Sequence, residues 1–253
     1  MSSQPPSQSD DSHSPDHQNF DNSKLKTQNS KLALICVGSG DGTRFGGDKL
    51  EERLGHRTVF AMALAALTRA CPEAPAVVVV PEPRLEFWRD QLSTEHPSAV
   101  LVNGGLRRQD SVRVGVETAA ANGAEVVLVH DAARPLVHPD DVRGVLLALG
   151  DADGAILSAL VPDTVKLTAR DGSVIKTVSR DDLRLAQTPQ VFRVASLVEA
   201  WEKVDPAHEW TDESALLELA GMRVRSVVAG HPNPKLTTES DLQLMQGLLR
   251  SGP

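Results

Sequence analysis

Cysteine, positive charge and long apolar runs are all scarce in this chain of 253 residues. Its two cysteines, Cys36 and Cys71, are too few for a disulfide framework or a zinc site of their own. No apolar run approaches the roughly 20 residues that a bilayer span requires. Lysine and arginine total 26 against 34 acidic residues, which argues against general nucleic-acid binding, because that affinity comes mostly from neutralising phosphates. These shortages exclude membrane proteins and secreted disulfide scaffolds.

The first 30 residues have a composition unlike the rest of the chain. Ser, Gln, Pro, Asn and Asp fill 22 of these 30 positions. Such a segment buries too little apolar surface to offset the entropy of ordering it, so residues 1–30 are predicted to be a disordered tail without a function of their own. The tail lacks the apolar core of a signal peptide and the arginines of a transit peptide, and the cytoplasm is the expected compartment.

Residues 31–253 are predicted to form a single domain in which short apolar runs alternate with amphipathic stretches. The runs are continuous rather than alternating with polar residues, which is typical of strands buried on both faces. Strands are expected over 32–37, 76–80, 99–102, 126–130, 154–160 and 224–228, and helices over 58–70, 84–92, 111–121, 139–149, 195–204, 212–220 and 238–249. This alternation predicts an α/β fold with a mostly parallel sheet flanked by helices.

One stretch, at about 162–184, departs from that pattern. Residues 164–168 and 174–178 alternate β-branched with polar side chains, and Asp171-Gly172 between them is a hairpin turn signal. A polar two-stranded hairpin is marginal by itself and needs another surface to lie on. We therefore expect a β-arm that projects from the sheet.

A glycine-rich loop follows the first predicted strand. It runs from Gly38 to Lys49, includes Gly40 and Gly42, and carries a second cation, Arg44. Glycines allow backbone N–H groups to turn inward around an anion. The spacing fits neither the dinucleotide fingerprint nor the P-loop, and a flexible turn without a ligand is the alternative interpretation. The two cations favour polyphosphate binding.

A second candidate site, His130-Asp131-Ala132-Ala133-Arg134-Pro135, directly follows a predicted strand. Ligands of open α/β sheets bind at the carboxyl ends of strands, where an aspartate can hold Mg²⁺ together with phosphate oxygens. The alternative is a surface aspartate, or one paired with Arg134. The small side chains of Ala132 and Ala133 leave room for a ligand and favour the functional interpretation.

Two further motifs are weak by themselves. Gly104-Gly105 follows the third predicted strand and allows close approach of the backbone, whereas Ser111 near the next helix is by itself more typical of an N-cap. Lys235-Leu236-Thr237-Thr238 precedes the last predicted helix, where threonines commonly serve as caps. Thr238 and Asp241 have the spacing of a capping box.

Taken together, these segments resemble the 2-C-methyl-D-erythritol 4-phosphate cytidylyltransferases of the non-mevalonate isoprenoid pathway. The motifs that carry the resemblance occur in the family's order over nearly all of residues 31–253: the glycine-rich loop with Arg44 and Lys49, Gly104-Gly105 with Asp110-Ser111-Val112, Val129 to Pro135, Asp163-Thr164-Val165-Lys166, Thr188-Pro189-Gln190, Thr211-Asp212-Glu213 and Lys235-Leu236-Thr237. The segment from His130 to Pro135 and the Thr-Pro-Gln motif are the most specific.

The resemblance implies a Rossmann-like nucleotidyltransferase fold, a homodimer with interlocking β-arms, and Mg²⁺-dependent transfer of CMP from CTP to methylerythritol phosphate with release of pyrophosphate. It implies catalytic roles for Arg44, Lys49 and Lys235, which would stabilise phosphate charge, and a metal-binding role for Asp131. The implied nucleotide-binding residues are Gly38, Ser39, Gly40, Gly42, Gly104, Gly105, Ser111 and Ala132. The implied substrate-binding residues are Asp131, Thr164, Arg180, Thr188, Thr211 and Thr237, with Thr164 and Arg180 reaching from the partner's arm.

The chain departs from the family's pattern in the glycine-rich loop and after the glycine pair. Gly38-Ser39-Gly40 stands where Ala-Ala-Gly is usual, Asp48 replaces a proline, Leu50 replaces a common glutamine, and Leu106 replaces a frequent acidic residue. Two alternatives therefore stay open: a ribitol-5-phosphate cytidylyltransferase, which shares the fold and most motifs, and a catalytically silent nucleotide-binding protein. A fused cyclodiphosphate synthase is not expected, because the chain ends soon after the last predicted helix.

Overall fold

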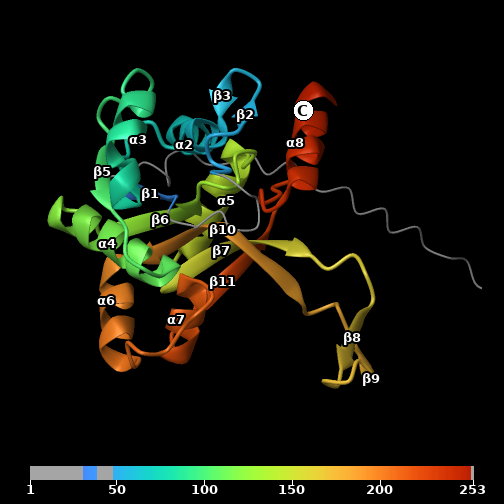
Figure 1. Ribbon diagram of the computed structural model, residues 1–253. Helices are drawn as coiled ribbons and strands as arrows, with labels where there is room; N and C mark the ends of the chain where they lie inside the picture. Colours follow the sequence, from blue (N-terminus) through green and yellow to red (C-terminus); the bar gives the residue numbers. More distant parts are fainter. Residues whose placement is uncertain (1–30, 39–47, 252–253) are drawn as a thin grey trace, which may run out of the picture.

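The computed structural model describes residues 31–38 and 48–251, and a seven-stranded sheet lies at its centre (Figure 1). The strands are β1 Leu32–Val37, β4 Ala76–Val80, β5 Val100–Asn103, β6 Val126–Asp131, β7 Gly154–Leu160, β10 Arg184–Arg193 and β11 Val224–Val228. Their order is β11-β7-β10-β6-β1-β4-β5, and all pairs are parallel except those that β10 makes with β6 and β7. The predicted α/β class is confirmed. The predicted tail over 1–30 lies outside the described residues.

Helices cover both faces of this sheet. They are α2 Val59–Ala70, α3 Leu85–Leu92, α4 Arg108–Ala121, α5 Pro139–Leu149, α6 Val194–Lys203, α7 Glu213–Leu219 and α8 Glu239–Ser251, with a 3₁₀ turn, η1 Glu82–Arg84, before α3. One layer contains α2, α3, α5 and α8, and the other contains α4, α6 and α7 (Figure 1). Within the described part of the chain, no helix combines the length and apolar character needed to cross a membrane.

Each face of the sheet has its own apolar core. Successive side chains of a strand point to opposite faces, so Leu34 and Cys36 of β1 join the core beneath α2 and α5, while Ala33 and Ile35 join the core beneath α4. Every residue of β1 and β4 is buried, whereas the edge strand β5 is partly exposed. This burial explains the continuous apolar runs of the inner strands.

Three elements differ from the sequence prediction. The segment over 185–192 is predicted only as a return of the chain, but it forms most of β10, inserted between β6 and β7. It is antiparallel because the chain re-enters the sheet from the arm. A short hairpin of β2 Arg53–Leu54 and β3 Arg57–Thr58 precedes α2, with Gly55 at its turn at φ +66°. Helix α4 begins at Arg108, three residues before the predicted start.

Strands β8 Val165–Thr168 and β9 Val174–Val178 form an antiparallel hairpin that projects away from the sheet (Figure 1). Gly172 lies at its turn with a φ of +86°, a conformation that favours glycine. Leu167 and Ile175 are among its large exposed apolar side chains. The hairpin therefore presents an apolar surface that its own chain leaves exposed.

A substitution at Gly154 tests the packing between β7 and β10. A Cβ at this position would lie 2.6 Å from Cδ1 of the buried Phe192 ring. We expect Gly154→Ala to lower the free energy of unfolding by about 1–3 kcal/mol, measured by urea denaturation. Gly144→Ala in α5 is the matched control, because nothing lies within 4 Å of its Cβ position, and it should stabilise the protein slightly. Equal stability changes in the two variants would contradict this packing.

Candidate active site

A cleft of about 100 Å³ lies where β1 and β6 end side by side. Its lining includes Gly38 and Lys49 from the ends of the glycine-rich loop, Arg108 of α4, Asp131 of β6 and Lys235 from the segment before α8. Because β1 and β6 are adjacent and parallel, their carboxyl ends place the loop beside the aspartate. Four predicted site residues are thus brought together. Ser39, Gly40, Gly42 and Arg44 lie outside the described residues.

The buried carboxylate of Asp131 contacts a cation on each side. Oδ1 accepts hydrogen bonds from Nε and Nη2 of Arg108, both at 3.1 Å, and Oδ2 accepts one from Nζ of Lys235 at 2.7 Å. Burial by itself raises the pKa of Asp131, but the charges of Arg108 and Lys235 outweigh burial and hold the pKa well below its ordinary value. Arg134, the partner considered from the sequence, instead donates to the carbonyl oxygen of Asn233 at 2.8 Å.

Arg108 is the site residue that sequence reasoning missed. Its Nη1 donates to both carboxylate oxygens of Glu213, at 2.9 and 3.2 Å, so one guanidinium joins α4 to β6 and α7. Glu213 is almost completely buried, which raises the pKa of its carboxyl against the opposing charge of Arg108. The sequence signal that could have identified Arg108 is its position shortly after a predicted strand and the glycine pair. Its neighbour Arg107 has the same charge, and only the fold shows which of the two faces the cleft.

Thr188 of β10 is held against Asp131 by a buried hydrogen-bond network. Its Oγ1 accepts from the backbone N–H of Asp131 at 3.0 Å and lies 3.2 Å from Nδ1 of His130. The Thr188 hydroxyl therefore donates to Nδ1, and the other ring nitrogen, Nε2, donates to the carbonyl oxygen of Arg134 at 3.0 Å. Burial lowers the pKa of His130 to about 4, so the ring is neutral at pH 7.

Hydrogen bonds to the hydroxyl of Ser111 hold the loop before α4 in place. Its Oγ accepts from the N–H of Gly105 at 3.1 Å and donates to the carbonyl oxygen of Arg107 at 3.1 Å. A Cβ at Gly105 would lie 2.4 Å from that of Asp110, so this close approach requires glycine. Ser111 lies inside the first turn of α4, and its interpretation as an N-cap is wrong. Its hydroxyl instead shapes the turn that also carries Gly104.

Backbone hydrogen bonds bring the segment before α8 to the cleft. The N–H of the buried Leu236 donates to the carbonyl oxygen of Ala133 at 2.8 Å, which places Lys235 beside the end of β6. In the first turn of α8, Asp241 accepts from the N–H of Thr237 at 2.9 Å and from that of the next residue at 2.8 Å. In return, the N–H of Asp241 donates to Oγ1 of Thr238 at 3.4 Å, and these reciprocal contacts confirm the predicted capping box.

The remaining predicted site residues do not line the Asp131 cleft. Ala132 is buried, and its N–H donates to the carbonyl oxygen of Val37 at 2.9 Å. Thr211 is exposed just before α7. Thr164 and Arg180 flank the β8–β9 hairpin and do not line the Asp131 cleft of their own chain.

Asp131 could hold a magnesium ion only together with oxygen ligands from a bound substrate. Residues 31–38 and 48–251 contain no cluster of three His, Cys, Asp or Glu side chains able to hold a metal. Mg²⁺ is usually held by one or two carboxylates together with substrate phosphates, and Asp131 is an ionised carboxylate at the end of a strand. Both oxygens of Asp131 contact cations, so Arg108 or Lys235 would have to release one of them before Asp131 could hold Mg²⁺.

The neutral state of His130 predicts a pH-dependent stability. Below pH 6.5 the unfolded chain binds a proton at this residue, whereas the native protein binds it only below about pH 4. The contribution of the neutral His130 ring to the free energy of unfolding is therefore fully present above pH 6.5. It is lost as the pH falls from 6.5 to about 4. Between about pH 7 and about pH 4.5, the parent protein should lose roughly 2–3 kcal/mol more than His130→Gln, measured by urea denaturation.

The exposed His56 provides the control for this measurement. His56→Gln should follow the profile of the parent protein, because it replaces an exposed side chain outside the buried network around His130. Identical pH profiles for His130→Gln and the parent protein would refute the neutral buried ring.

Comparison with known proteins identifies the family of this chain. A family model described as 2-C-methyl-D-erythritol 4-phosphate cytidylyltransferase matches residues 32–251. The protein of that name from Pelotomaculum thermopropionicum is 33% identical over 228 residues, which cover 87% of this chain and 95% of the relative. A bifunctional enzyme IspD/IspF from Rhodospirillum rubrum is 38% identical over 228 residues. The match covers 87% of this chain and 58% of the relative, so the chain spans little more than half the length of this bifunctional protein.

Solved structures show the same likeness. A 4-diphosphocytidyl-2C-methyl-D-erythritol synthase from Anaerococcus prevotii superposes with a TM-score of 0.77 at 25% identity, covering 88% of this chain and 99% of that chain. The 2-C-methyl-D-erythritol 4-phosphate cytidylyltransferase from Thermus thermophilus gives a TM-score of 0.69 at 31% identity, covering 87% and 99%. With the family match extending from β1 to α8, the chain belongs to the 2-C-methyl-D-erythritol 4-phosphate cytidylyltransferase family of nucleotidyltransferases.

Proposed function

We propose that this chain transfers CMP from CTP to 2-C-methyl-D-erythritol 4-phosphate, giving 4-diphosphocytidyl-2-C-methyl-D-erythritol and pyrophosphate. The observation that carries the proposal is the Asp131 carboxylate between Arg108 and Lys235, with Lys49 lining the same cleft. One fixed anion among three cations suits a triphosphate that arrives with Mg²⁺. The acceptor phosphate is already a nucleophile, so the reaction needs no serine–histidine pair.

In the proposed reaction, an oxygen of the acceptor phosphate attacks the α-phosphorus of CTP as the bond to the bridging oxygen of pyrophosphate breaks. Two polyanions approach each other, so positioning and charge neutralisation supply most of the rate enhancement. Lys235 neutralises the α-phosphate, and Lys49, together with Arg44, stabilises the triphosphate and the leaving pyrophosphate. Mg²⁺ bound at Asp131 would add neutralisation of the phosphates.

The cytosine base is proposed to bind along the turn that contains Gly104 and Gly105. Gly105 is exposed, so its backbone is accessible to a ligand, and its close approach to Asp110 leaves no space for a side chain. The side chain of Leu106 is fully exposed, so this turn offers the base backbone groups and not the acidic side chain common at this position. Ser111 supports recognition by holding the turn, and Ala132 contributes a small buried neighbour.

The acceptor is proposed to bind between two subunits of a homodimer. A hollow of about 650 Å³ lies next to the cleft, with Arg134, Asn233 and Lys235 among its lining residues. The exposed apolar side chains of the arm favour coverage by a second copy of the chain. In that arrangement the partner's arm delivers Thr164 and Arg180 to the acceptor, while Thr188, Thr211 and Thr237 come from the chain that binds CTP.

Pyrophosphate release tests the proposed reaction. The purified chain should release pyrophosphate with CTP, Mg²⁺ and methylerythritol phosphate, but not when ATP or GTP replaces CTP. Lys49→Ala should lower kcat by roughly 10²–10³-fold while the protein stays folded, because a cation that stabilises the transition state is lost. Pyrophosphate release with ribitol 5-phosphate, but not with methylerythritol phosphate, would show that the proposed acceptor is wrong. Tight CTP binding without release from either acceptor would favour a catalytically silent protein.

Mixed dimers test the shared acceptor site. Arg180→Ala should raise KM for methylerythritol phosphate while leaving CTP binding intact, and Lys49→Ala should inactivate the nucleotide half. If each site combines two chains, dimers containing one variant of each kind regain one complete site and recover activity. Arg170→Ala, which removes an exposed arginine near the tip of the arm, should behave as the parent protein. Verified mixed dimers without recovered activity would contradict a shared site.

A further inference from the structure

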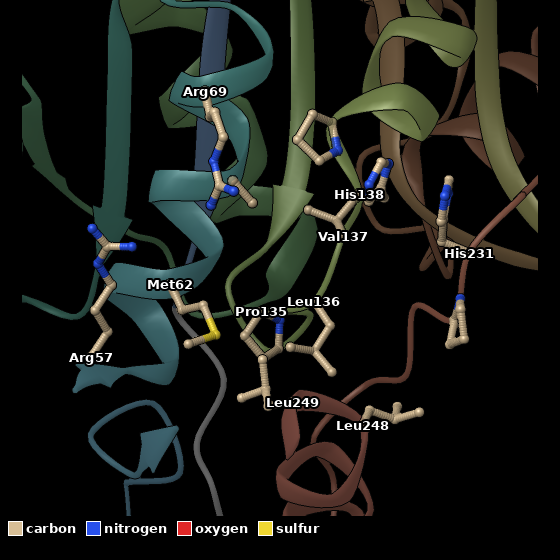
Figure 2. A pocket seen from close by; sticks show the side chains of 13 residues that line it. Arg57, Met62, Arg69, Pro135, Leu136, Val137, His138, His231, Leu248 and Leu249 are labelled. Atoms are coloured by element: carbon tan, nitrogen blue, oxygen red, sulfur yellow. The ribbon is translucent and has the colours of Figure 1, made fainter. Parts of the chain in front are cut away.

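A second cavity, of about 340 Å³, lies between α2, α8 and the loop before α5 (Figure 2). It shares no lining residue with the Asp131 cleft, but it adjoins the hollow of about 650 Å³ proposed for the acceptor, since His231, Pro232 and Leu248 line both. Its apolar surface comes from Met62 and Ala66 of α2, Leu136 and Val137 of the loop, and Leu249 of α8. This volume is within the range of small-molecule sites, and a mostly apolar lining is typical of them.

Basic side chains border this apolar surface. Arg57 and Arg69 lie on one side of the cavity and the rings of His138 and His231 on the other, and none of the lining residues is acidic (Figure 2). Arg57 is oriented by a hydrogen bond of 2.8 Å from its Nε to Glu95. An arginine beside an apolar wall binds the anionic group of a ligand whose body lies on that wall.

The histidine side of the cavity is preformed. The rings of His138 and His231 are stacked, with centroids 3.6 Å apart. The buried carboxylate of Asp141 accepts from the N–H groups of Gly230, at 2.8 Å, and His231, at 3.2 Å. On the opposite chain segment, Nδ1 of His138 accepts from the N–H of Asp140 at 3.2 Å. A wall fixed in this way reduces the ordering that a ligand must impose.

Two walls of the cavity continue directly into segments of the catalytic cleft. The loop wall follows Asp131 along the chain, and His231-Pro232 precedes Lys235. We propose that this cavity is a second, non-catalytic site for an organic anion with an apolar body, such as a phosphate monoester of a hydrocarbon chain. Its occupancy further restricts the motion of both segments and thereby changes the affinity of the cleft for CTP, and CTP changes the affinity of the cavity by the same factor.

Calorimetric titration of the full chain with n-octyl phosphate, below its micelle concentration, tests the site. We expect saturable binding of one molecule per chain, much weaker binding of n-octanol and inorganic phosphate, and a change in CTP affinity of roughly fivefold or more at saturation. Hydrogen exchange should slow at residues 135–139 and 231–232. Unchanged CTP affinity would overturn the coupling. Because the readout is binding, the test stands apart from the proposed transfer reaction.

Two variants and a control locate this binding. Arg69→Glu reverses an exposed cation, and Ala66→Phe fills the apolar part, with its folding checked by thermal unfolding. Each should weaken n-octyl phosphate binding roughly tenfold or more. Arg89→Glu is the control, because Arg89 is an exposed arginine of α3 outside the cavity, and it should bind as the parent protein does. Equal affinity of all three variants, or simple displacement of n-octyl phosphate by CTP, would refute the second site.

Discussion

Asp131 is a buried anion, and its neighbours compensate the free-energy cost of that burial. Removing a carboxylate from water costs several kcal/mol unless cations and hydrogen bonds replace the lost solvation. Arg108 and Lys235 do so here, and Arg108 is in turn balanced by the buried Glu213. The chain of charges fixes α4, β6, α7 and the segment before α8 relative to one another. Loss of Arg108 would leave the buried carboxylate of Glu213 without the cation that compensates it.

The same charges also suit the proposed chemistry. Arg108 and Lys235 donate hydrogen bonds to Asp131, and phosphate oxygens can accept from the same donor groups. A nucleotide with Mg²⁺ can therefore exchange partners within a preorganised cluster, without creating an isolated charge. The neutral His130 completes this arrangement, because its ring orients Thr188 next to Asp131 and adds no further positive charge.

Two loops connect the Asp131 cleft to the second cavity, the one between α2, α8 and the loop before α5. The segment after β6 passes from Asp131 in the catalytic cleft to Leu136 and Val137 in the second cavity. The segment before α8 runs from His231 to Lys235 in the same way. Loops at the carboxyl ends of parallel strands lie together at one edge of the sheet, and the proposed coupling would pass through these two loops.

The sequence by itself determined the strands buried on both faces, the glycine-rich loop after β1 and the aspartate at the end of β6, because each is a local pattern of apolar, glycine and charged residues. It also placed Lys235 in a motif before the last helix. Only the tertiary structure decided that Arg108, and not Arg107, faces Asp131, that Glu213 is buried against it, and that residues 184–193 form a central antiparallel strand. Arg108 and Glu213 are 105 positions apart. Their pairing depends on how α4 and α7 pack on the sheet, and periodicity along one segment contains no information about that packing.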